Sequence, residues 1–597
     1  MKRLNYYKSR LELVIKKLQK KQKLLRFIGL MRFIVFLLIL LAFFILMPKN
    51  TVVGVVSAGV LLILFLTLVK YYHKQNSQVR HLQKLAEIND DEIKIQSHSF
   101  HDRDAGEEFI DSNHPYAFDM DLFGRGSLFQ YMNRTVTSLG RKKFADLLLN
   151  ETLISEDILS RQHSVQELKE KIDLSQNFMA SGKLHSDSME DIEQLIKWIE
   201  KPLFYLNSKL WMTISKVIPL TTLVSITLAV YFPAFRLLAI VFYLIQLFII
   251  SSRLSVTSKE HLNISKRYEA LKKYGFLFRI IQENQFNSEA LKKISESLVT
   301  GPLSAAKSIK KLSKIVKAFD SRLNFLVALF IEGLLLWDIQ CMIRLEKWKK
   351  LQGHHFEMWM DTLANFDSFV TLSTFAFNHP GFAIPELSDK VILESNELGH
   401  PLIRPEDRVC NHFTVREEGI LIVITGANMA GKSTFLRTVA VNMILAMTGT
   451  TVCAKNFVFK PMSIFSSMRT SDSLDNNESY FYAELKRLKQ MLDRLKEGES
   501  LFVILDEILK GTNSADKQKG SRAVLERIIK YNGTGIIATH DLSLAVIEKE
   551  FPDNIINKCF EIEIDNASVY FDYILRDGIT TKMNASLLMK QMGILTD

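Results

Sequence analysis

A glycine-rich segment at residues 426–434, GANMAGKST, has the residue types and the spacing of a phosphate-binding loop. It directly follows residues 420–425, ILIVIT, a short apolar run that predicts a buried strand. Glycines let successive backbone N–H groups face phosphate oxygens, and the helix expected after the loop adds the positive end of its dipole. The segment therefore predicts a phosphate site between a strand and a helix. Its residues are Gly426, Ala427, Asn428, Met429, Ala430, Gly431, Lys432, Ser433 and Thr434.

Two side chains of this loop have expected roles in nucleotide chemistry. Lys432 would reach the β- and γ-phosphates, and the Ser433 hydroxyl would bind Mg²⁺. A chance match is conceivable in a long chain, but the preceding strand and the complete spacing argue against one. The predicted ligands are therefore ATP and Mg²⁺.

Acidic and imidazole groups follow two further predicted strands. Residues 501–505, LFVIL, predict a strand that leads into Asp506 and Glu507, and residues 534–538, TGIIA, predict one that leads towards His540. Ligands of open α/β sheets bind at the carboxyl ends of the strands, so we expect these groups near the loop. Asp506 would complete the Mg²⁺ shell, Glu507 would orient or deprotonate the attacking water, and His540 would contact the γ-phosphate. This order of motifs is that of ABC-type ATPases, whose two sites are completed across a dimer.

The same motifs resemble those of the MutS family. The Asn-Met pair inside the phosphate loop, the segment 479–485, the block 505–513 and the triplet 538–540 are similar to the family's phosphate loop, Ser-Thr-Phe segment, Asp-Glu-x3-Gly-Thr block and Ala-Thr-His. The resemblance implies that Ser479 contacts the nucleotide of the opposite subunit. It therefore implies a homodimer formed through the ATPase domains.

Two residues are candidates for the adenine pocket. Where the family usually places an aromatic ring on one face of the base, this chain has Arg408, whose planar guanidinium can stack on a base. Tyr573 falls where the resemblance implies the other stacking residue. We expect the base to lie between them.

The resemblance also covers the helical region, where residues 122–168 are similar to the start of the family's core and lever region. A basic segment and a predicted membrane hairpin take up the length before residue 115, so no room is expected for mismatch-reading and connector domains. The family's Phe-x-Glu mismatch wedge is likewise expected to be absent. The resemblance thus implies DNA as a partner that is possible but unproven, without dedicated mismatch recognition.

Two pairs of apolar runs predict two membrane hairpins. Residues 33–47 and 51–69 carry no charge, and a bilayer span takes about 20 residues. A signal peptide is the alternative for the first run, but a long basic segment precedes it and a second run follows at once. Residues 217–232 and 237–250 predict the second hairpin, with buried core helices as the alternative. Lys and Arg flank the outer ends, so we expect a multi-pass protein of the cell (inner) membrane with a cytoplasmic ATPase domain.

Charge is distributed unevenly along the 597 residues. Residues 1–26 carry ten Lys or Arg and one Glu, which accounts for most of the net charge of +11. Lysines also line one face of a predicted amphipathic helix, where they could hold DNA or lipid phosphates or form an ordinary solvated face. These are Lys307, Lys310, Lys311, Lys314 and Lys317. The four cysteines show no metal-ligand spacing and predict neither zinc nor disulfides.

The fold class expected is a multidomain α plus α/β protein whose C-terminal ABC-type P-loop ATPase domain has a mainly parallel sheet. Residues 325–337 are apolar, but Glu332 predicts a buried helix rather than a fifth span. Two other functions are considered: an ABC transporter, disfavoured because the spans are few and featureless, and a scaffold with an inactive ATPase. The predicted segments are a basic cytoplasmic tail (1–26), hairpin 1 (27–70), a first helical core and lever segment (71–206), hairpin 2 (207–253), a second helical core and lever segment (254–389) and the ATPase domain (390–597).

Overall fold

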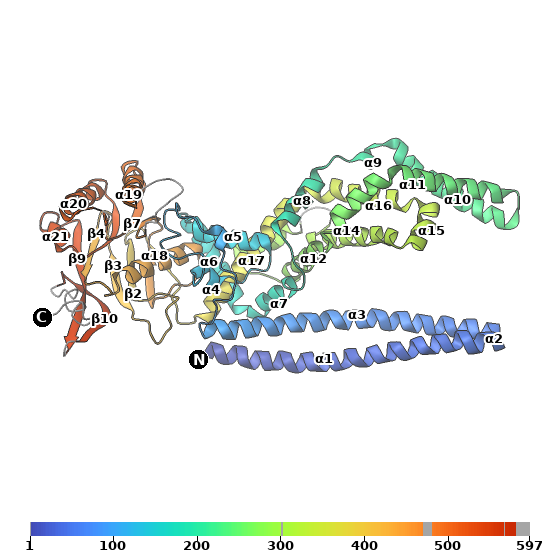
Figure 1. The fold of residues 1–597 in the computed structure, drawn as a ribbon, viewed down its shortest axis with the longest axis horizontal. Coiled ribbons are helices and arrows are strands. Elements are labelled where there is room, and N and C mark those ends of the chain that lie inside the picture. The colour runs from blue at the N-terminus through green and yellow to red at the C-terminus, as the bar shows by residue number, and fades with distance from the viewer. Residues whose placement is uncertain (1, 300–302, 470–479, 511, 566–567, 581–597) are drawn as a thin grey trace.

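The computed structural model describes residues 2–299, 303–469, 480–510, 512–565 and 568–580. The molecule is elongated, with the β-sheets at one end and two helical hairpins that both point towards the other end (Figure 1). A body of shorter helices lies between them. This arrangement separates the predicted nucleotide chemistry from the apolar hairpins.

Hairpin 1 consists of two long helices that pack along each other. It runs through α1 (Lys2–Leu41), a π-helical turn (Ala42–Leu46), α2 (Met47–Lys49) and α3 (Thr51–Gln96). At 1.5 Å per residue, α1 alone is about 60 Å long. Residues 2–26, most of the predicted basic tail, form the first part of α1 and continue directly into the apolar run. α3 likewise continues past the predicted boundary at residue 70.

A buried polar network joins the base of hairpin 1 to the helical body. The Glu92 carboxylate of α3 accepts hydrogen bonds from Arg134 Nε at 2.7 Å and from Asn378 Nδ2 at 2.8 Å, and Tyr7 of α1 donates to Asn378 Oδ1 at 2.7 Å. Burial raises the pKa of Glu92, but the charge and hydrogen bonds of Arg134 outweigh this, so the pKa lies below its usual value. The pair is therefore ionised inside the protein.

The helical body supports the ATPase domain and leads away from it towards the hairpins. Its buried apolar side chains form one cluster that continues into the C-terminal domain. Its helices are α4 (Leu128–Met132), α5 (Ser138–Leu149), α6 (Ser155–Glu170), α7 (Ile172–Gly182), α8 (Met189–Glu200), α9 (Phe204–Asn207), α12 (Tyr268–Gln282), α13 (Glu289–Ser297), α14 (Ala305–Phe319), α15 (Phe325–Leu335), α16 (Trp337–Gln352) and α17 (Phe356–Asn378).

Hairpin 2 consists of α10 (Lys209–Tyr231) and α11 (Phe235–Ser265). Many of its apolar side chains are exposed, including Leu237 at 72% and Phe248 at 76%, so these are not buried core helices of this chain. By length and composition alone, four helices in the described part of the chain can cross a membrane: Arg3–Lys49, Thr51–Gln96, Lys209–Tyr231 and Phe235–Ser265.

The C-terminal domain contains a six-stranded sheet with the order β10-β9-β4-β8-β7-β6. All its neighbouring strands run parallel except β10, which pairs antiparallel with β9. The strands are β4 (Leu421–Gly426), β6 (Ser463–Ser467), β7 (Leu501–Asp506), β8 (Thr534–Thr539), β9 (Ile555–Asp565) and β10 (Ser568–Asp577). A second sheet has the order β1-β5-β2-β3. Its strands are β1 (Glu386–Leu387), β2 (Leu393–Leu398), β3 (Asn411–Val415) and β5 (Asn456–Phe459).

The α-helices among the described residues of this domain are α18 (Lys432–Thr448), α19 (Tyr480–Lys496), α20 (Ser514–Lys530) and α21 (Leu542–Ala545). α18 follows β4 directly through the phosphate loop. Its second half is buried throughout, so the helix is held between the sheet and the helical body. The loop is thus fixed at both of its ends.

Candidate active site

Three central strands bring the predicted site residues to one edge of the six-stranded sheet. Every residue of β4, β7 and β8 is buried, as expected for strands covered on both faces. The pairing sets Thr425 of β4 beside Thr539 of β8, and Asp506 of β7 beside Ala538 of β8. Because the strands are parallel and in this register, the segments that follow them emerge side by side.

The phosphate loop depends on a glycine at its last turn. Gly431 has a φ of +98°, and a Cβ built on it would lie 2.9 Å from Cδ1 of Tyr573. Any other residue would be strained in its backbone and crowded against the ring. Gly431 is also the N-cap of α18, so this turn directs the backbone N–H groups at the start of the helix towards the loop.

The Lys432 side chain lies within the phosphate loop itself. Its Nζ donates to the carbonyl oxygens of Gly426 at 2.7 Å and Ala427 at 3.0 Å. Burial lowers the pKa of Lys432, and the nearby charges of Glu507 and Asp506 partly oppose this. The amine is thus near the loop backbone and close to two carboxylates, where a phosphate oxygen would be a strong additional partner.

Ser433 and Asp506, the two predicted Mg²⁺ ligands, are in direct contact. The Ser433 hydroxyl donates to Asp506 Oδ2 at 2.5 Å. A hydroxyl and a carboxylate are hard oxygen ligands of the kind Mg²⁺ binds, and Mg²⁺ usually takes few protein ligands because it keeps water and phosphate oxygens. The donor set therefore fits the predicted ion.

Glu507 and His540 form a second pair beside the first. Glu507 Oε1 lies 3.2 Å from Nδ1 of His540. Burial raises the pKa of Glu507, but the hydrogen bond and charge of His540 and the charges of Lys510 and Lys432 together lower it below its usual value. The carboxylate is therefore ionised at neutral pH and available to accept a proton.

Glu484 of α19 holds the turn after Glu507, a role that the sequence did not reveal. Its Oε1 accepts a hydrogen bond from the backbone N–H of Leu509 at 2.6 Å. Both Glu507 and Leu509 have positive φ values, of 53° and 60°, so the backbone here needs such support. The signal in the sequence that could have revealed this role of Glu484 is its position as an acidic residue on the buried face of an amphipathic helix. Ser479 and Gly511 lie outside the described residues.

A cavity of about 390 Å³ adjoins the phosphate loop. The loop's Asn428 and Ser433 line it together with Glu507, and its remaining wall includes Val409 and Tyr573. This combination of phosphate-binding groups and apolar surface suits a nucleotide.

Arg408 is not among the residues that line this cavity, and its stacking on the base stays a prediction. Its Nη2 donates to the carbonyl oxygen of Ile403 at 2.6 Å, and its guanidinium lies over the Phe382 ring. These contacts hold the Arg408 side chain away from the cavity. The neighbouring Val409 and the carbonyl partner Ile403 line the cavity instead.

Tyr573 does line the cavity and is positioned by Asn411 of β3. Asn411 Nδ2 donates to the Tyr573 carbonyl at 3.0 Å, and Asn411 Oδ1 accepts from the Leu575 N–H at 2.7 Å. These bonds hold an irregularity in β10 where Tyr573 has a φ of +57°. Asn411 is thus a positioning residue that the sequence did not identify.

Replacing Tyr573 with Ala is expected to weaken nucleotide binding about tenfold, because stacking of a base on an aromatic ring contributes about 1–3 kcal/mol. Tyr573→Phe, which keeps the ring, is the control and is expected to bind as the wild type does. Fluorescent ATP titration measures both. Equal weakening by both substitutions would contradict stacking.

Comparison with known proteins agrees with this geometry. The fold and the site define a nucleotide-binding domain built on a phosphate loop, and residues 422–592 match the family model MutS domain V. Human MutS protein homolog 4 is 30% identical over 246 residues, which cover 40% of this chain and 25% of the relative. DNA mismatch repair protein MutS of Thermotoga petrophila is 31% identical over 198 residues, 33% of this chain and 25% of the relative. DNA mismatch repair protein MutS of Fusobacterium nucleatum is 32% identical over 222 residues, which cover 36% of this chain and 23% of the relative.

The chain therefore belongs to the MutS family through its C-terminal domain. The matches span about a quarter of the length of these curated relatives. The residues that the family model matches, 422–592, follow the apolar helices of both hairpins in the sequence.

Proposed function

We propose that this protein is a membrane-anchored MutS-like ATPase that binds and hydrolyses ATP at composite sites of a homodimer. The observation that carries the proposal is the pair of contacts at the ends of the central strands, Ser433 with Asp506 and Glu507 with His540. Matches to MutS relatives over the same domain support it.

The residues divide the work of hydrolysis between them. Lys432 and the loop N–H groups bind the phosphates, and Ser433 with Asp506 would hold Mg²⁺, which neutralises charge on the phosphates. Glu507 accepts the proton of the attacking water, and His540, whose Nδ1 lies 3.2 Å from the Glu507 carboxylate, positions that carboxylate and senses the γ-phosphate. Ser479 is proposed to act on the nucleotide of the partner subunit.

The proposed location is the cell (inner) membrane, with the ATPase domain in the cytoplasm. Four apolar helices with exposed outer faces support this, since a soluble protein rarely exposes such an area of apolar surface. ATP-driven association of two ATPase domains would then be transmitted through the helical body to the hairpins.

The test of the activity is phosphate release by the full chain purified in detergent. ATP hydrolysis is expected with Mg²⁺ and is expected to fall to background when EDTA removes the metal and to return when Mg²⁺ is added back. Hydrolysis that is insensitive to EDTA, or no hydrolysis by a protein that binds ATP, would contradict the proposal.

A second candidate function is binding of DNA along a basic surface. All five stripe lysines of α14 are exposed, while Ile309, Leu312 and Phe319 are buried on its other face. α14 and α12 enclose a groove of about 650 Å³ lined by Lys307, Lys310, Lys314, Lys317, Lys272 and Arg279. An excess of cations of this kind suits a phosphate backbone.

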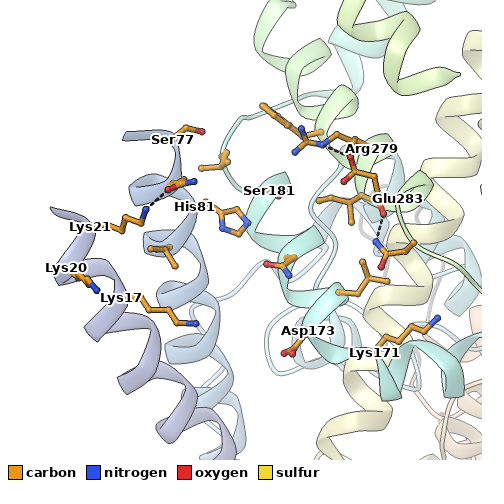
Figure 2. A pocket seen from close by; sticks show the side chains of 18 of the residues that line it. Lys17, Lys20, Lys21, Ser77, His81, Lys171, Asp173, Ser181, Arg279 and Glu283 are labelled. Atoms are coloured by element: carbon orange, nitrogen blue, oxygen red, sulfur yellow. Dashed lines mark hydrogen bonds and ion pairs between the residues drawn. The ribbon is translucent and has the colours of Figure 1, made fainter. Parts of the chain in front are cut away.

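A second cavity continues this surface towards hairpin 1. It measures about 1280 Å³ and lies between α1 and α3 on one side and α7 and α12 on the other (Figure 2). Arg279 lines both the groove and this cavity. Three lysines of α1, Lys17, Lys20 and Lys21, also line the cavity. The Lys21 Nζ donates to the neutral side chains of Gln75 and Gln78, so its charge is available to an anion.

Replacing Lys307, Lys310, Lys314 and Lys317 together with Gln is expected to weaken DNA binding and to reduce the slope of log K against log salt by up to about 4, one for each lost phosphate contact. The matched control replaces four exposed lysines of the ATPase helices: Lys489, Lys496, Lys519 and Lys530. Fluorescence anisotropy at several salt concentrations measures both. Equal slopes for the two variants would remove the groove from consideration.

A further inference from the structure

We propose that α15 is a re-entrant membrane helix, which enters the cytoplasmic side of the bilayer beside hairpin 2 and returns to the same side. Its partner is the acyl chains of the lipid. The proposal rests on the proposed membrane embedding of hairpin 2, and it adds a fifth apolar element that does not cross the membrane.

The contacts of α15 place its middle beside the apolar half of α11. The Tyr243 hydroxyl donates to the Leu329 carbonyl at 3.0 Å, and Gln246 Nε2 lies 3.5 Å from the Leu334 carbonyl. Gly333 packs directly under the Tyr243 ring, where a Cβ would collide with it. Tyr243 and Gln246 lie seven and four residues before Ile250, the last residue of the apolar run, hence about 10 and about 6 Å inside it.

The segments before and after α15 both contact the polar part of α11, which follows Ile250. On the entering side, Arg322 Nη2 donates to Ser258 Oγ at 2.9 Å. On the returning side, Asp338 Oδ2 accepts from Thr257 Oγ1 at 3.1 Å and pairs with Arg322 at 2.9 Å. The chain therefore enters and leaves α15 at the same position along α11. The ion pair between Arg322 and Asp338 joins the two flanking segments there.

The exposed face of α15 is apolar and continues the apolar surface of hairpin 2. On α15, Phe330 is 64% and Val327 39% exposed, and Leu323 in the turn just before the helix is 73% exposed. The one acidic residue of the helix, Glu332, is buried and accepts a hydrogen bond from the Asp338 N–H at 3.2 Å. An exposed aromatic and aliphatic face in water is unfavourable, but in hydrocarbon it is not. Glu332 is turned inwards, as expected for an ionisable residue at membrane depth.

The backbone of α15 also meets the requirements of hydrocarbon, where unpaired N–H and C=O groups are costly. Asn324 Oδ1 caps the first turn by accepting from the Val327 N–H at 3.3 Å. At the other end, Leu336 turns into the left-handed region, is fully buried, and still donates its N–H to the Glu332 carbonyl at 3.2 Å. The turn out of the helix is thus shielded by protein.

The test uses single cysteines labelled with bimane in the full chain, reconstituted into vesicles whose lipids carry a doxyl quencher on the acyl chain. The background is Cys410→Ser, because the other three cysteines are buried. The sites are Phe330→Cys and Val327→Cys on α15, Ile240→Cys on the exposed face of α11, and Lys310→Cys on the exposed face of α14.

Loss of fluorescence at both α15 sites, comparable to that at Ile240→Cys and absent at Lys310→Cys, is the expected result. Quenching at Ile240→Cys without quenching at either α15 site would overturn the re-entrant helix and leave the membrane anchor standing. No quenching at Ile240→Cys would overturn the embedding of hairpin 2 and the present inference with it. Two α15 sites are used so that one misfolded variant does not decide the outcome.

Discussion

Replacing Glu507 with Gln is expected to lower the rate of ATP hydrolysis by about 10²–10⁴-fold, the usual contribution of a general base. The amide keeps the size and the hydrogen-bonding ability of the carboxylate but cannot accept the proton of the attacking water. Because Lys432, Ser433 and Asp506 are untouched, ATP binding is expected to persist. Steady-state phosphate release and ATP titration of the purified protein measure the two effects separately.

The same variant is expected to accumulate as a dimer when ATP is present. In a composite site, nucleotide closes the two domains and hydrolysis releases them, so a variant that binds without turnover stays closed. Size-exclusion chromatography with light scattering, with and without ATP, measures this. The control is Glu550→Gln, an exposed carboxylate that pairs with Arg522 far from the loop. Undiminished turnover in Glu507→Gln would refute the assigned role.

The pH dependence of the wild type follows from the direction of the Glu507 shift. Its pKa is lowered, since the effects of His540, Lys510 and Lys432 together outweigh the effect of burial. The carboxylate therefore stays ionised as pH falls from 7 to 5. Protonation of this group is expected to reduce hydrolysis only below the usual carboxyl range, in a pH profile corrected for unfolding.

Replacing Arg134 with Met is expected to destabilise the protein by about 3–5 kcal/mol, because it leaves the buried Glu92 carboxylate without its charge partner. The matched control is the double variant Glu92→Leu with Arg134→Met, which removes both charges and is expected to recover much of the loss. Thermal unfolding in detergent measures all three proteins. A single variant as stable as the wild type would contradict the network.

The sign of the pH effect distinguishes this explanation from simple loss of packing. The folded-state pKa of Glu92 lies below its unfolded value, so its stabilisation is present above the unfolded pKa and is lost as pH falls towards the folded value. Without Arg134, burial is opposed only by the smaller effects of the Arg103 charge and the Asn378 hydrogen bond, so the pKa of Glu92 is expected to rise. The single variant is then expected to gain relative stability on mild acidification, the opposite of the wild type.

Local sequence patterns predicted the components of the site that follow strands. Parallel strands in register place whatever follows them at one edge, so the apolar runs before Asp506 and before the loop that carries Ser433 were sufficient to predict that these side chains meet. The roles of Lys432, Glu507 and His540 stay predictions, as do the boundaries of the segments. Ser479 lies outside the described residues.

Side-chain direction and long-range pairing could not be predicted in the same way. Arg408 and Val409 are neighbours, and only the tertiary fold decides that Val409 faces the cavity while Arg408 bonds Ile403. The basic segment 1–26 showed charge but not its helical continuity with the apolar run. Glu332 predicted a buried helix at residues 325–337, but α15 has an exposed face, because burial depends on elements distant in sequence.

The network around Glu92 sets an order of events in biosynthesis. Glu92 and its partner Asn378 are 286 residues apart in the chain. At about 5–20 residues per second, about 15–60 s separate the synthesis of the two residues. Hairpin 1 is therefore complete well before the residue that fastens its base exists. Until α17 emerges, Glu92 has Arg134 but not Asn378 as a partner, and the Tyr7 hydroxyl of α1 lacks the acceptor that it has in the folded protein.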